Sequence, residues 1–422
     1  MPSKRPKILF LAYYFPPLNG IACVRTWNIA KYLSRLGWDV TVVTPDPHLW
    51  RLGDSSEIEK TNLELNKAGI KRLSTGHGWR FLSPGSLKCE NEGIKWFVGA
   101  VCRQIASKWR IDREIGWINE AKRACSTLVK EDVDIILASG KPFCCFRLAK
   151  WLSDKLKRPY VLDYRDPWTN NPHAKLQKFQ KTIKEEQQLL QKSAAVTIVS
   201  PSWALDLRKR YDLKGKVYVI SNGFDPEELN RVQPVQFPYF TIVYTGNFYP
   251  PKRVIAPLMA ALKQLKEFRG EENGKWFLHY YGQMGDHVRE EAERFGVTNN
   301  VKLHGKVPRS VALAAVAGAD VSVVITSIPD KVTIADQGMV TGKVFEPLGL
   351  GSPILLICPL ESDAALLGQC QGVHVFQKEN VGGMAHFLNK LIEGNGEKIA
   401  GGEEYSWVNL SKQLNDILLK SL

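Results

Sequence analysis

The stretch DKVTIADQGMVTGKVFEPLGLGSPILLI, residues 330–357, decides the fold more than any other part of the chain. It holds a loop with two glycines, a segment from Lys343 to Leu350 that is predicted to be helical, a Gly-Ser-Pro turn, and the apolar strand Ile354–Ile357. A loop that opens a helix directs backbone N–H groups at its ligand, which suits a phosphate. Glu346 follows one turn later, and a carboxylate suits a sugar diol because it accepts two hydrogen bonds. An ordinary turn with a surface glutamate would show the same pattern.

The length of the chain predicts two domains, because 422 residues exceed what one hydrophobic core usually fills. No run of about 18 uncharged apolar residues is present, so no membrane-spanning helix is predicted. The residues Met1–Pro6 lead directly into an apolar strand and lack the pattern of a signal peptide. A cytoplasmic location is therefore expected.

Positive charge is concentrated in the first half of the chain. The formal net charge is +14, and residues 1–230 carry 38 Lys and Arg against 24 Asp and Glu, whereas residues 231–422 carry 19 of each. This asymmetry indicates that the first half faces a polyanion or the anionic inner face of a membrane, while the second half handles a small ligand. Nucleic acid is not the expected partner, because the basic and aromatic residues form no recognisable nucleic-acid-binding module.

The segment Ile94–Ile111 has apolar residues at helical spacing and several basic residues, so an amphipathic helix is predicted. Such a helix with tryptophans suits a membrane interface. The apolar face of an amphipathic helix more often packs against the hydrophobic core of its own domain, and this second interpretation is favoured.

The first half alternates apolar strands with helices, which is typical of a parallel sheet. Strands are predicted at 7–13, 39–44, 133–139, 160–164, 195–200 and 217–220, and the first helix at 24–36. From Leu49 to Glu92 the polar, irregular pattern predicts a long excursion of loops. Gly20 follows the first strand, and ligands of such sheets bind beyond the carboxyl ends of the strands. No GxGxxG motif is present, so an NAD or FAD site is not expected.

Charged residues follow the predicted strand Tyr160–Tyr164, in the sequence Arg165-Asp166-Pro167. Side chains at the carboxyl end of a parallel strand face the ligand side of the sheet. Alternatively, Arg165 pairs with Asp166 or Asp163 and only holds the loop in place.

The second half repeats this alternation, with strands predicted at 240–245, 276–281, 301–303 and 320–325. The Asn222-Gly223 turn and the proline-rich stretch to Pro238 form the best domain boundary. We therefore predict an α/β protein of two Rossmann-like domains, residues 1–225 and 238–403, with a C-terminal helix at about 404–422 that packs on the first domain. A cleft between the domains is the expected ligand site.

Four stretches in order, YYFPPLNGIA, SNGFD, YTGNFYPPK and GKVFEPLGLGSPILL, resemble the retaining nucleotide-sugar glycosyltransferases of family 4, which have the GT-B fold. The resemblance covers nearly the whole chain and is weakest from Leu49 to Val133. It implies transfer of a sugar from a nucleotide-diphosphate donor to a saccharide or lipid-linked acceptor, in cell-surface polysaccharide or glycolipid biosynthesis. It implies neither a metal ion nor any other cofactor, and no protein nucleophile.

The resemblance assigns roles by position. Gly20 and Asn19 match the glycine loop that meets the transferred sugar and the acceptor, Lys252 matches the lysine that neutralises the diphosphate, and Glu346 matches the ribose-binding carboxylate. The candidate catalytic residues are Gly20, Asp166, Lys252 and Glu346, with Arg165 and His173 on the acceptor side. The candidate donor-binding residues are Asn19, Gly246, Asn247, Arg253, Gln283, His304, Val307, Gly338, Met339, Val340, Thr341, Gly342 and Lys343. The resemblance implies that the backbone amides of the last five cradle the diphosphate.

Two positions depart from the family pattern. Gly338 stands where the family usually has a second glutamate, eight residues before Glu346, and Asn247 stands where it usually has an arginine. Asp336, Gln337 and Arg253 are near enough to substitute. These departures keep open a non-catalytic nucleotide-sugar-binding partner of another transferase. A nucleotide-sugar epimerase of the same fold is a further alternative, although its carboxylate arrangement is not evident in the sequence.

Overall fold

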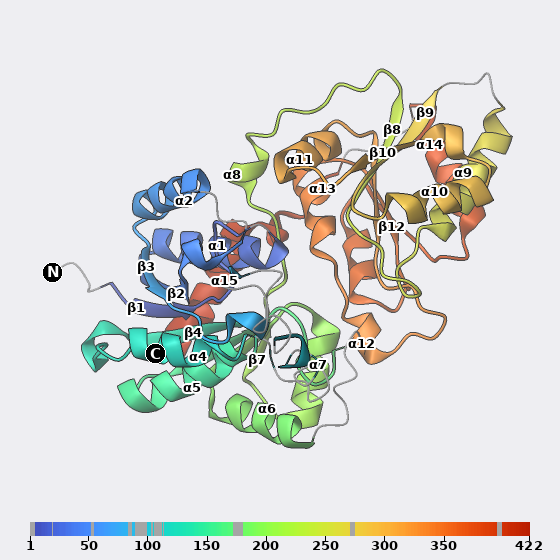
Figure 1. The fold of residues 1–422 in the computed structure, drawn as a ribbon. Helices are drawn as coiled ribbons and strands as arrows, with labels where there is room; N and C mark the ends of the chain where they lie inside the picture. The colour runs from blue at the N-terminus through green and yellow to red at the C-terminus, as the bar shows by residue number, and fades with distance from the viewer. Residues whose placement is uncertain are drawn as a thin grey trace. The chain divides into compact units, whose positions relative to one another are not determined.

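A computed structural model describes residues 5–18, 20–51, 55–82, 87–88, 99–102, 104, 112, 114–171, 180–270, 275–394 and 399–422. The chain divides into two compact units (Figure 1). Unit 1 comprises Met1–Val199, Ala204–Ser221 and Leu410–Leu422, and unit 2 comprises Ser200–Trp203 and Asn222–Asn409. Each unit is built on one parallel sheet, so the prediction of a two-domain α/β fold is confirmed.

The sheet of unit 1 has seven parallel strands in the order β3-β2-β1-β4-β5-β6-β7. The strands are β1 (Lys7–Leu11), β2 (Asp39–Pro45), β3 (Lys71–Thr75), β4 (Ile135–Gly140), β5 (Tyr160–Tyr164), β6 (Ala195–Ile198) and β7 (Val217–Val219). The central strands β4 and β5 are buried on both faces, which is why their sequences are almost continuously apolar. The carboxyl ends of all these strands lie at one edge of the sheet.

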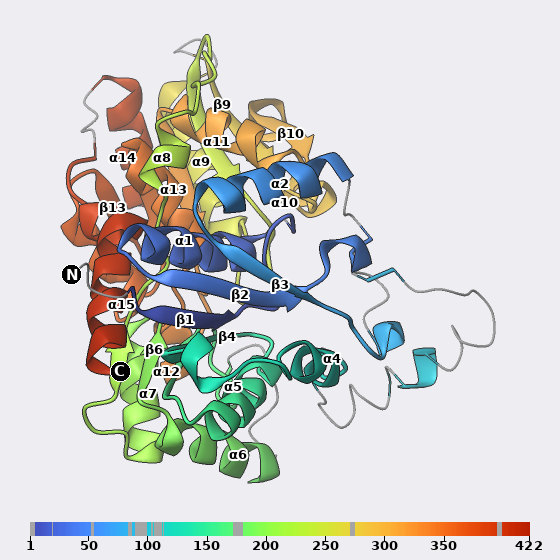
Figure 2. The same ribbon diagram turned by 90° about the vertical axis from the view of Figure 1, so that its left-hand side faces the viewer.

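Helices cover both faces of this sheet. They are α1 (Ile21–Arg35), α2 (Ser55–Lys67), α4 (Trp117–Ala124), α5 (Cys144–Leu156), α6 (Gln180–Lys192), α7 (Pro201–Tyr211) and α15 (Trp407–Lys420). Figure 2 shows α1 and α2 on one side of strands β1 to β3, and α4 and α5 on the other. Trp38 donates a hydrogen bond from Nε1 to Oδ1 of Asn415 in α15 at 2.8 Å, so the end of the chain packs on unit 1.

The prediction of loops from Leu49 to Glu92 is wrong, because this segment contains α2 and the edge strand β3. In α2 only Ile58, Thr61 and Leu65 are buried, at helical spacing within a polar sequence. Strand β3, KRLST, pairs with β2 alone and lacks the apolar run of a central strand. Most of the predicted amphipathic helix Ile94–Ile111 lies outside the described residues.

The sheet of unit 2 has six parallel strands in the order β10-β9-β8-β11-β12-β13. They are β8 (Phe240–Thr245), β9 (Trp276–Tyr281), β10 (Val301–Gly305), β11 (Val321–Ile325), β12 (Ile354–Ile357) and β13 (Val373–Phe376). The helices are α8 (Pro226–Leu229), α9 (Ala256–Arg269), α10 (Gly285–Arg294), α11 (Arg309–Ala317), α12 (Ile334–Gln337), α13 (Phe345–Leu350) and α14 (Val381–Ile392). Figure 1 shows α11 and α13 on one side of this sheet, and α9, α10 and α14 on the other.

The main core of unit 2 lies between the sheet and helices α9 and α14. Leu258, Leu262 and Leu388 are fully buried there against strand residues such as Leu278. This rigid scaffold presents the loops that follow β8, β9 and β10 at the carboxyl edge of the sheet, where ligands of such sheets bind. None of the described helices is long and apolar enough to cross a membrane.

Candidate functional site

The loop after β8 is built around Gly246. Its φ of 118° is strained for any residue with a side chain, and its N–H donates to the carbonyl of Tyr281 at 2.7 Å. The space that a side chain would occupy is filled by Lys343, whose Nζ lies 1.1 Å from where a Cβ atom on Gly246 would be. The positive φ favours glycine at 246, and the contact with Lys343 brings the predicted loops after β8 and before α13 together.

Lys252 forms an ion pair with Asp336, from Nζ to Oδ1 at 2.7 Å. The Asp336 side chain is fully buried and also accepts hydrogen bonds from Ser327 and Thr333. Burial opposes ionisation, but the hydrogen bonds from Lys252, Thr333 and Ser327 outweigh it and hold the pKa of Asp336 below its usual value. The charge of Lys252 is thus largely balanced within the protein.

The segment predicted as the helix Lys343–Leu350 is divided, because Gly342–Val344 forms a 3-10 turn and α13 begins only at Phe345. The amide of Val344 donates to Thr341 at 3.3 Å and that of Met339 donates to Asp336 at 3.1 Å. The predicted use of the Met339 amide for the diphosphate stays a prediction, and in the structure this amide donates to the Asp336 carbonyl. Within the described part of the chain, the amides of Val340 and Thr341 keep no backbone partner, so they stay free for an anion.

Glu346 is held by an arginine that sequence reasoning missed. Arg309, at the start of α11, donates from Nη1 to Oε1 of Glu346, and its Nε and Nη2 donate to the two carboxylate oxygens of Glu228 at 2.8 and 3.1 Å. The Glu346 side chain is 17% exposed. The predicted ribose-binding carboxylate is therefore partly exposed and held in place by its neighbour.

Of the residues predicted to flank the base, His304 lies on β10, and Gln283 and Val307 lie in the loops that follow β9 and β10. Asn247 and Gln283 are joined by two hydrogen bonds, one between side chains at 3.3 Å and one from the Gln283 amide to Asn247 Oδ1 at 2.9 Å. The exposed ring of His304 stacks on Tyr281, with centroids 4.3 Å apart and an 8° interplanar angle. His304 Nε2 is 3.0 Å from His279 Nδ1, and burial, His304 and Lys302 lower the pKa of His279 to about 4. An uncharged aromatic surface of this kind suits a stacked base.

Val307, in the loop that follows β10, packs against the small apolar cluster around Val243 and Tyr281. Its side chain fixes the loop beside the His304 ring.

Gly338 cannot carry the glutamate that the family pattern places there. A Cβ atom on Gly338 would lie 2.2 Å from Cδ1 of Trp203, a residue of unit 2, and the Trp203 indole donates to the carbonyl of Ala335 at 2.9 Å. The indole thus fills the space in which a second carboxylate would grip the donor sugar.

In unit 1, Arg165 does not pair with Asp163 or Asp166, so that structural alternative is wrong. Asp163 is fully buried and binds Arg25 instead, with Nη2 to Oδ1 at 2.6 Å. Arg165 donates to the carbonyls of Gly140 and Lys141 and lies over the ring of Tyr14 at 5.8 Å. Among the described residues, the half-buried carboxylate of Asp166 has no hydrogen-bond partner.

Gly20 precedes α1 with a φ of 149° and has open space around it. Its carbonyl accepts from the amides of Cys23 and Val24. The other two predicted residues of this region, Asn19 and His173, lie outside the described residues.

Glu114 is a second group that sequence reasoning missed. Its Oε1 accepts a hydrogen bond from the Tyr14 hydroxyl at 3.1 Å, and the Asp112 carboxylate beside it caps α5 through the Cys144 amide at 3.0 Å. Burial and the neighbouring Asp112 raise the pKa of Glu114 to about 8. Tyr14, Glu114 and Arg165 therefore form a polar group at the carboxyl edge of the unit 1 sheet. The segment around Glu114 has no strand or motif that would have marked it in the sequence.

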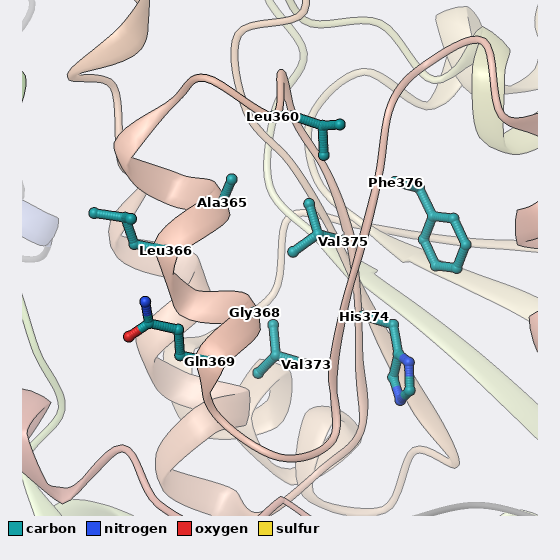
Figure 3. Close-up of a pocket in the computed structure, with 9 residues that line it drawn as sticks. All are labelled: Leu360, Ala365, Leu366, Gly368, Gln369, Val373, His374, Val375 and Phe376. Atoms are coloured by element: carbon teal, nitrogen blue, oxygen red, sulfur yellow. The ribbon is translucent and has the colours of Figure 1, made fainter.

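A shallow apolar hollow of about 580 Å³ lies elsewhere, at the edge strand β13. Figure 3 shows its lining side chains, which come from Leu360, the 3-10 helix Asp363–Gln369 and β13. It contains none of the predicted site residues and no convergent charges, so it is not the candidate site. The described residues also hold no cluster of three or more His, Cys, Asp and Glu side chains suited to a metal ion.

Comparison with solved structures shows the architecture. Sucrose-phosphate synthase from Thermosynechococcus elongatus is 14% identical, with a TM-score of 0.62, and the match covers 99% of each chain. TarM is 12% identical with a TM-score of 0.60, covering 99% of this chain and 96% of that one. Anabaena Alr3699/HepE in complex with UDP is 18% identical with a TM-score of 0.56, covering 99% and 100%.

The chain has the GT-B fold. Residues 67–228 also match the family model described as Glycosyltransferase Family 4. No curated protein sequence matches this chain. In GT-B terms, unit 2 carries the candidate donor site around Gly246 and Glu346, and unit 1 carries the candidate acceptor residues around Gly20 and Arg165.

Proposed function

We propose that this GT-B protein is a glycosyltransferase that moves a sugar from a nucleoside-diphosphate donor to a saccharide or lipid-linked acceptor, with retention of anomeric configuration. The observation that carries the proposal is the convergence, in unit 2, of the Gly246 loop with basic side chains, free amides and the accessible carboxylate of Glu346. The match of residues 67–228 to Glycosyltransferase Family 4 supports it. The complex of the similar HepE with UDP supports a nucleoside-diphosphate donor.

In this mechanism the bond between the anomeric carbon and the phosphate oxygen breaks, and negative charge grows on the diphosphate. Cations and N–H groups that point at the diphosphate oxygens stabilise the transition state more than the ground state, because the negative charge on these oxygens is larger in the transition state. Lys252, Arg253 and the amides of Val340–Lys343 supply them. The leaving phosphate accepts the proton of the attacking hydroxyl, so neither a protein nucleophile nor a metal ion takes part.

The acceptor is proposed to bind to unit 1. Gly20 and Asn19 meet the transferred sugar, and Arg165, Asp166 and His173 contact the acceptor. The carboxylate of Asp166 supports this assignment, because it is half-buried and has no hydrogen-bond partner among the described residues, so it is available for a sugar hydroxyl.

We also propose a role in cell-surface polysaccharide or glycolipid biosynthesis, at the cytoplasmic face of a membrane. The excess of basic residues in 1–230 supports peripheral binding to anionic lipid. Sedimentation with vesicles of phosphatidylglycerol and phosphatidylcholine tests this membrane binding. If the protein did not sediment with the vesicles even at low ionic strength, the proposed membrane binding would be contradicted.

A thermal-shift screen of UDP, GDP, ADP and dTDP sugars tests the donor assignment, because a ligand that binds the folded state raises the melting temperature. The selected donor should then be hydrolysed slowly or transferred to an acceptor, and nuclear magnetic resonance of the product reports its anomeric configuration. Absence of any shift with all donors would contradict the proposal.

The second candidate is a non-catalytic nucleotide-sugar-binding partner of another transferase. It is favoured by Trp203, which fills the space of the missing glutamate, and by Asn247 in place of the arginine. Tight donor binding without hydrolysis or transfer would support it. Interconversion of two nucleotide sugars would instead support an epimerase of the same fold.

A further inference from the structure

The side chain of Lys343 reaches the loop that follows β8. Its Nζ lies against Gly246, 1.1 Å from the position a Cβ atom would take, and its Cε would be 2.4 Å from that atom. Any residue larger than glycine at 246 would therefore displace the ammonium group. The tertiary structure thus places a cation where the loop backbone of the candidate site approaches its ligand.

Arg253 contributes a second cation to the same place. Burial and, to a smaller extent, the positive charge of Arg253 lower the pKa of Lys343 to about 8, while the carboxylate of Glu346 acts in the opposite direction. Arg253 lies over the ring of Tyr249 at 5.4 Å, its Nη2 is 3.8 Å from Met339 Sδ, and its buried Nε has no hydrogen-bond partner among the described residues. No carboxylate is ion-paired with either cation in the described part of the chain.

The other charged groups nearby are already neutralised. Lys252 is paired with the buried Asp336, and Glu346 is paired with Arg309. Two partly buried cations without an ion-paired carboxylate cost free energy on folding, and an anionic ligand between them offsets this cost. At this loop, and among the described residues, Lys343 and Arg253 are therefore the cations left for an anionic ligand.

We propose that the Lys343 ammonium group, with Arg253, binds the diphosphate of the donor and replaces the arginine that the family pattern has at position 247. This rests on the proposed function. As the bond from the anomeric carbon to the phosphate oxygen breaks, its electron pair stays on that oxygen, and the acceptor oxygen forms the new bond to the sugar. Lys343 stabilises the growing charge by hydrogen bonding and keeps its own proton, while the acceptor proton passes to the leaving phosphate.

The test is calorimetric titration of the full chain with inorganic pyrophosphate, UDP and uridine at pH 7. In Lys343→Met, affinity for pyrophosphate and UDP should fall about 10- to 100-fold, because a charge-assisted hydrogen bond is lost, while uridine binding stays unchanged. Lys343→Arg should recover part of the affinity. Lys390→Met, at an exposed position of α14, is the matched control and should bind like the wild type.

A second variant, Gly246→Ala, addresses the contact itself. The Cβ atom that Gly246→Ala introduces would displace the Lys343 ammonium group, so this variant should show the same loss of pyrophosphate affinity as Lys343→Met. The double variant Lys343→Met/Gly246→Ala should bind pyrophosphate no more weakly than either single variant. Near-native melting temperatures confirm folding. Additive losses, or equal pyrophosphate binding by the wild type and Lys343→Met, would overturn the assignment. If pyrophosphate binding depended on Lys343 but no nucleotide bound more tightly than pyrophosphate, the anion site would be supported. That result would contradict only the proposed function.

Discussion

Arg309 is ion-paired with Glu346, the carboxylate predicted to hold the ribose hydroxyls. A bidentate contact with Glu228 fixes the other side of the Arg309 guanidinium. Since Arg309 contacts only Oε1 of Glu346, the second oxygen remains accessible to a diol. The arginine therefore holds the carboxylate in one orientation.

Arg309→Met should weaken nucleotide binding about 5- to 10-fold, because Glu346 loses its fixed orientation. Calorimetry with the donor selected by screening measures this, and Arg289→Met, which removes an exposed ion pair with Asp286, is the control. Tighter binding by Arg309→Met would mean that the arginine competes with the ribose instead.

Glu346→Ala should lower affinity for the nucleoside diphosphate at least about 10-fold, because two hydrogen bonds to ribose are lost. Binding of inorganic pyrophosphate should not fall, since no ribose is present. The melting temperature should change little, because the side chain lies in a largely polar surface contact. Equal losses for both ligands would place Glu346 at the phosphates.

Lys252→Ala should cost stability as well as activity, because it leaves the buried carboxylate of Asp336 without its cation. We expect a loss of about 1–3 kcal/mol in the free energy of unfolding. The double variant Lys252→Ala/Asp336→Asn removes the charge and should restore part of this stability in urea titrations, without restoring turnover. If the single variant were as stable as the wild type, the ion pair would contribute nothing to the fold.

The stability of unit 1 should depend on pH through Glu114, between about pH 4 and pH 8. Its pKa in the folded state, about 8, lies above the value of an unfolded glutamate, so the stabilisation is complete below pH 4 and is lost as the pH rises through 8. Between pH 6 and pH 9 the free energy of unfolding should fall by about 2–3 kcal/mol more in the wild type than in Glu114→Gln. Urea titrations at both pH values measure the difference, and parallel pH profiles would contradict the shift.

Much of the fold follows from local pattern. The predicted bounds of β5, β8, β9 and β12 agree with the structure, because central parallel strands are buried on both faces and are apolar throughout. The edge strand β3 and helix α2 were missed, since an edge strand needs no continuous apolar run. The division of the predicted helix after Gly342 also escaped the sequence, because a 3-10 turn and an α-helix share the same residue preferences.

The sequence by itself determined the two parallel α/β units and the loops that carry the candidate donor site, because apolar periodicity and glycine placement are local properties. Only the tertiary structure decided which charges meet. Lys252 and Asp336 are 84 residues apart, Arg25 and Asp163 are 138 apart, and Lys343 reaches Gly246 from another strand's loop. Partners of charged side chains depend on distances across the folded sheet, and no spacing along the chain encodes these distances.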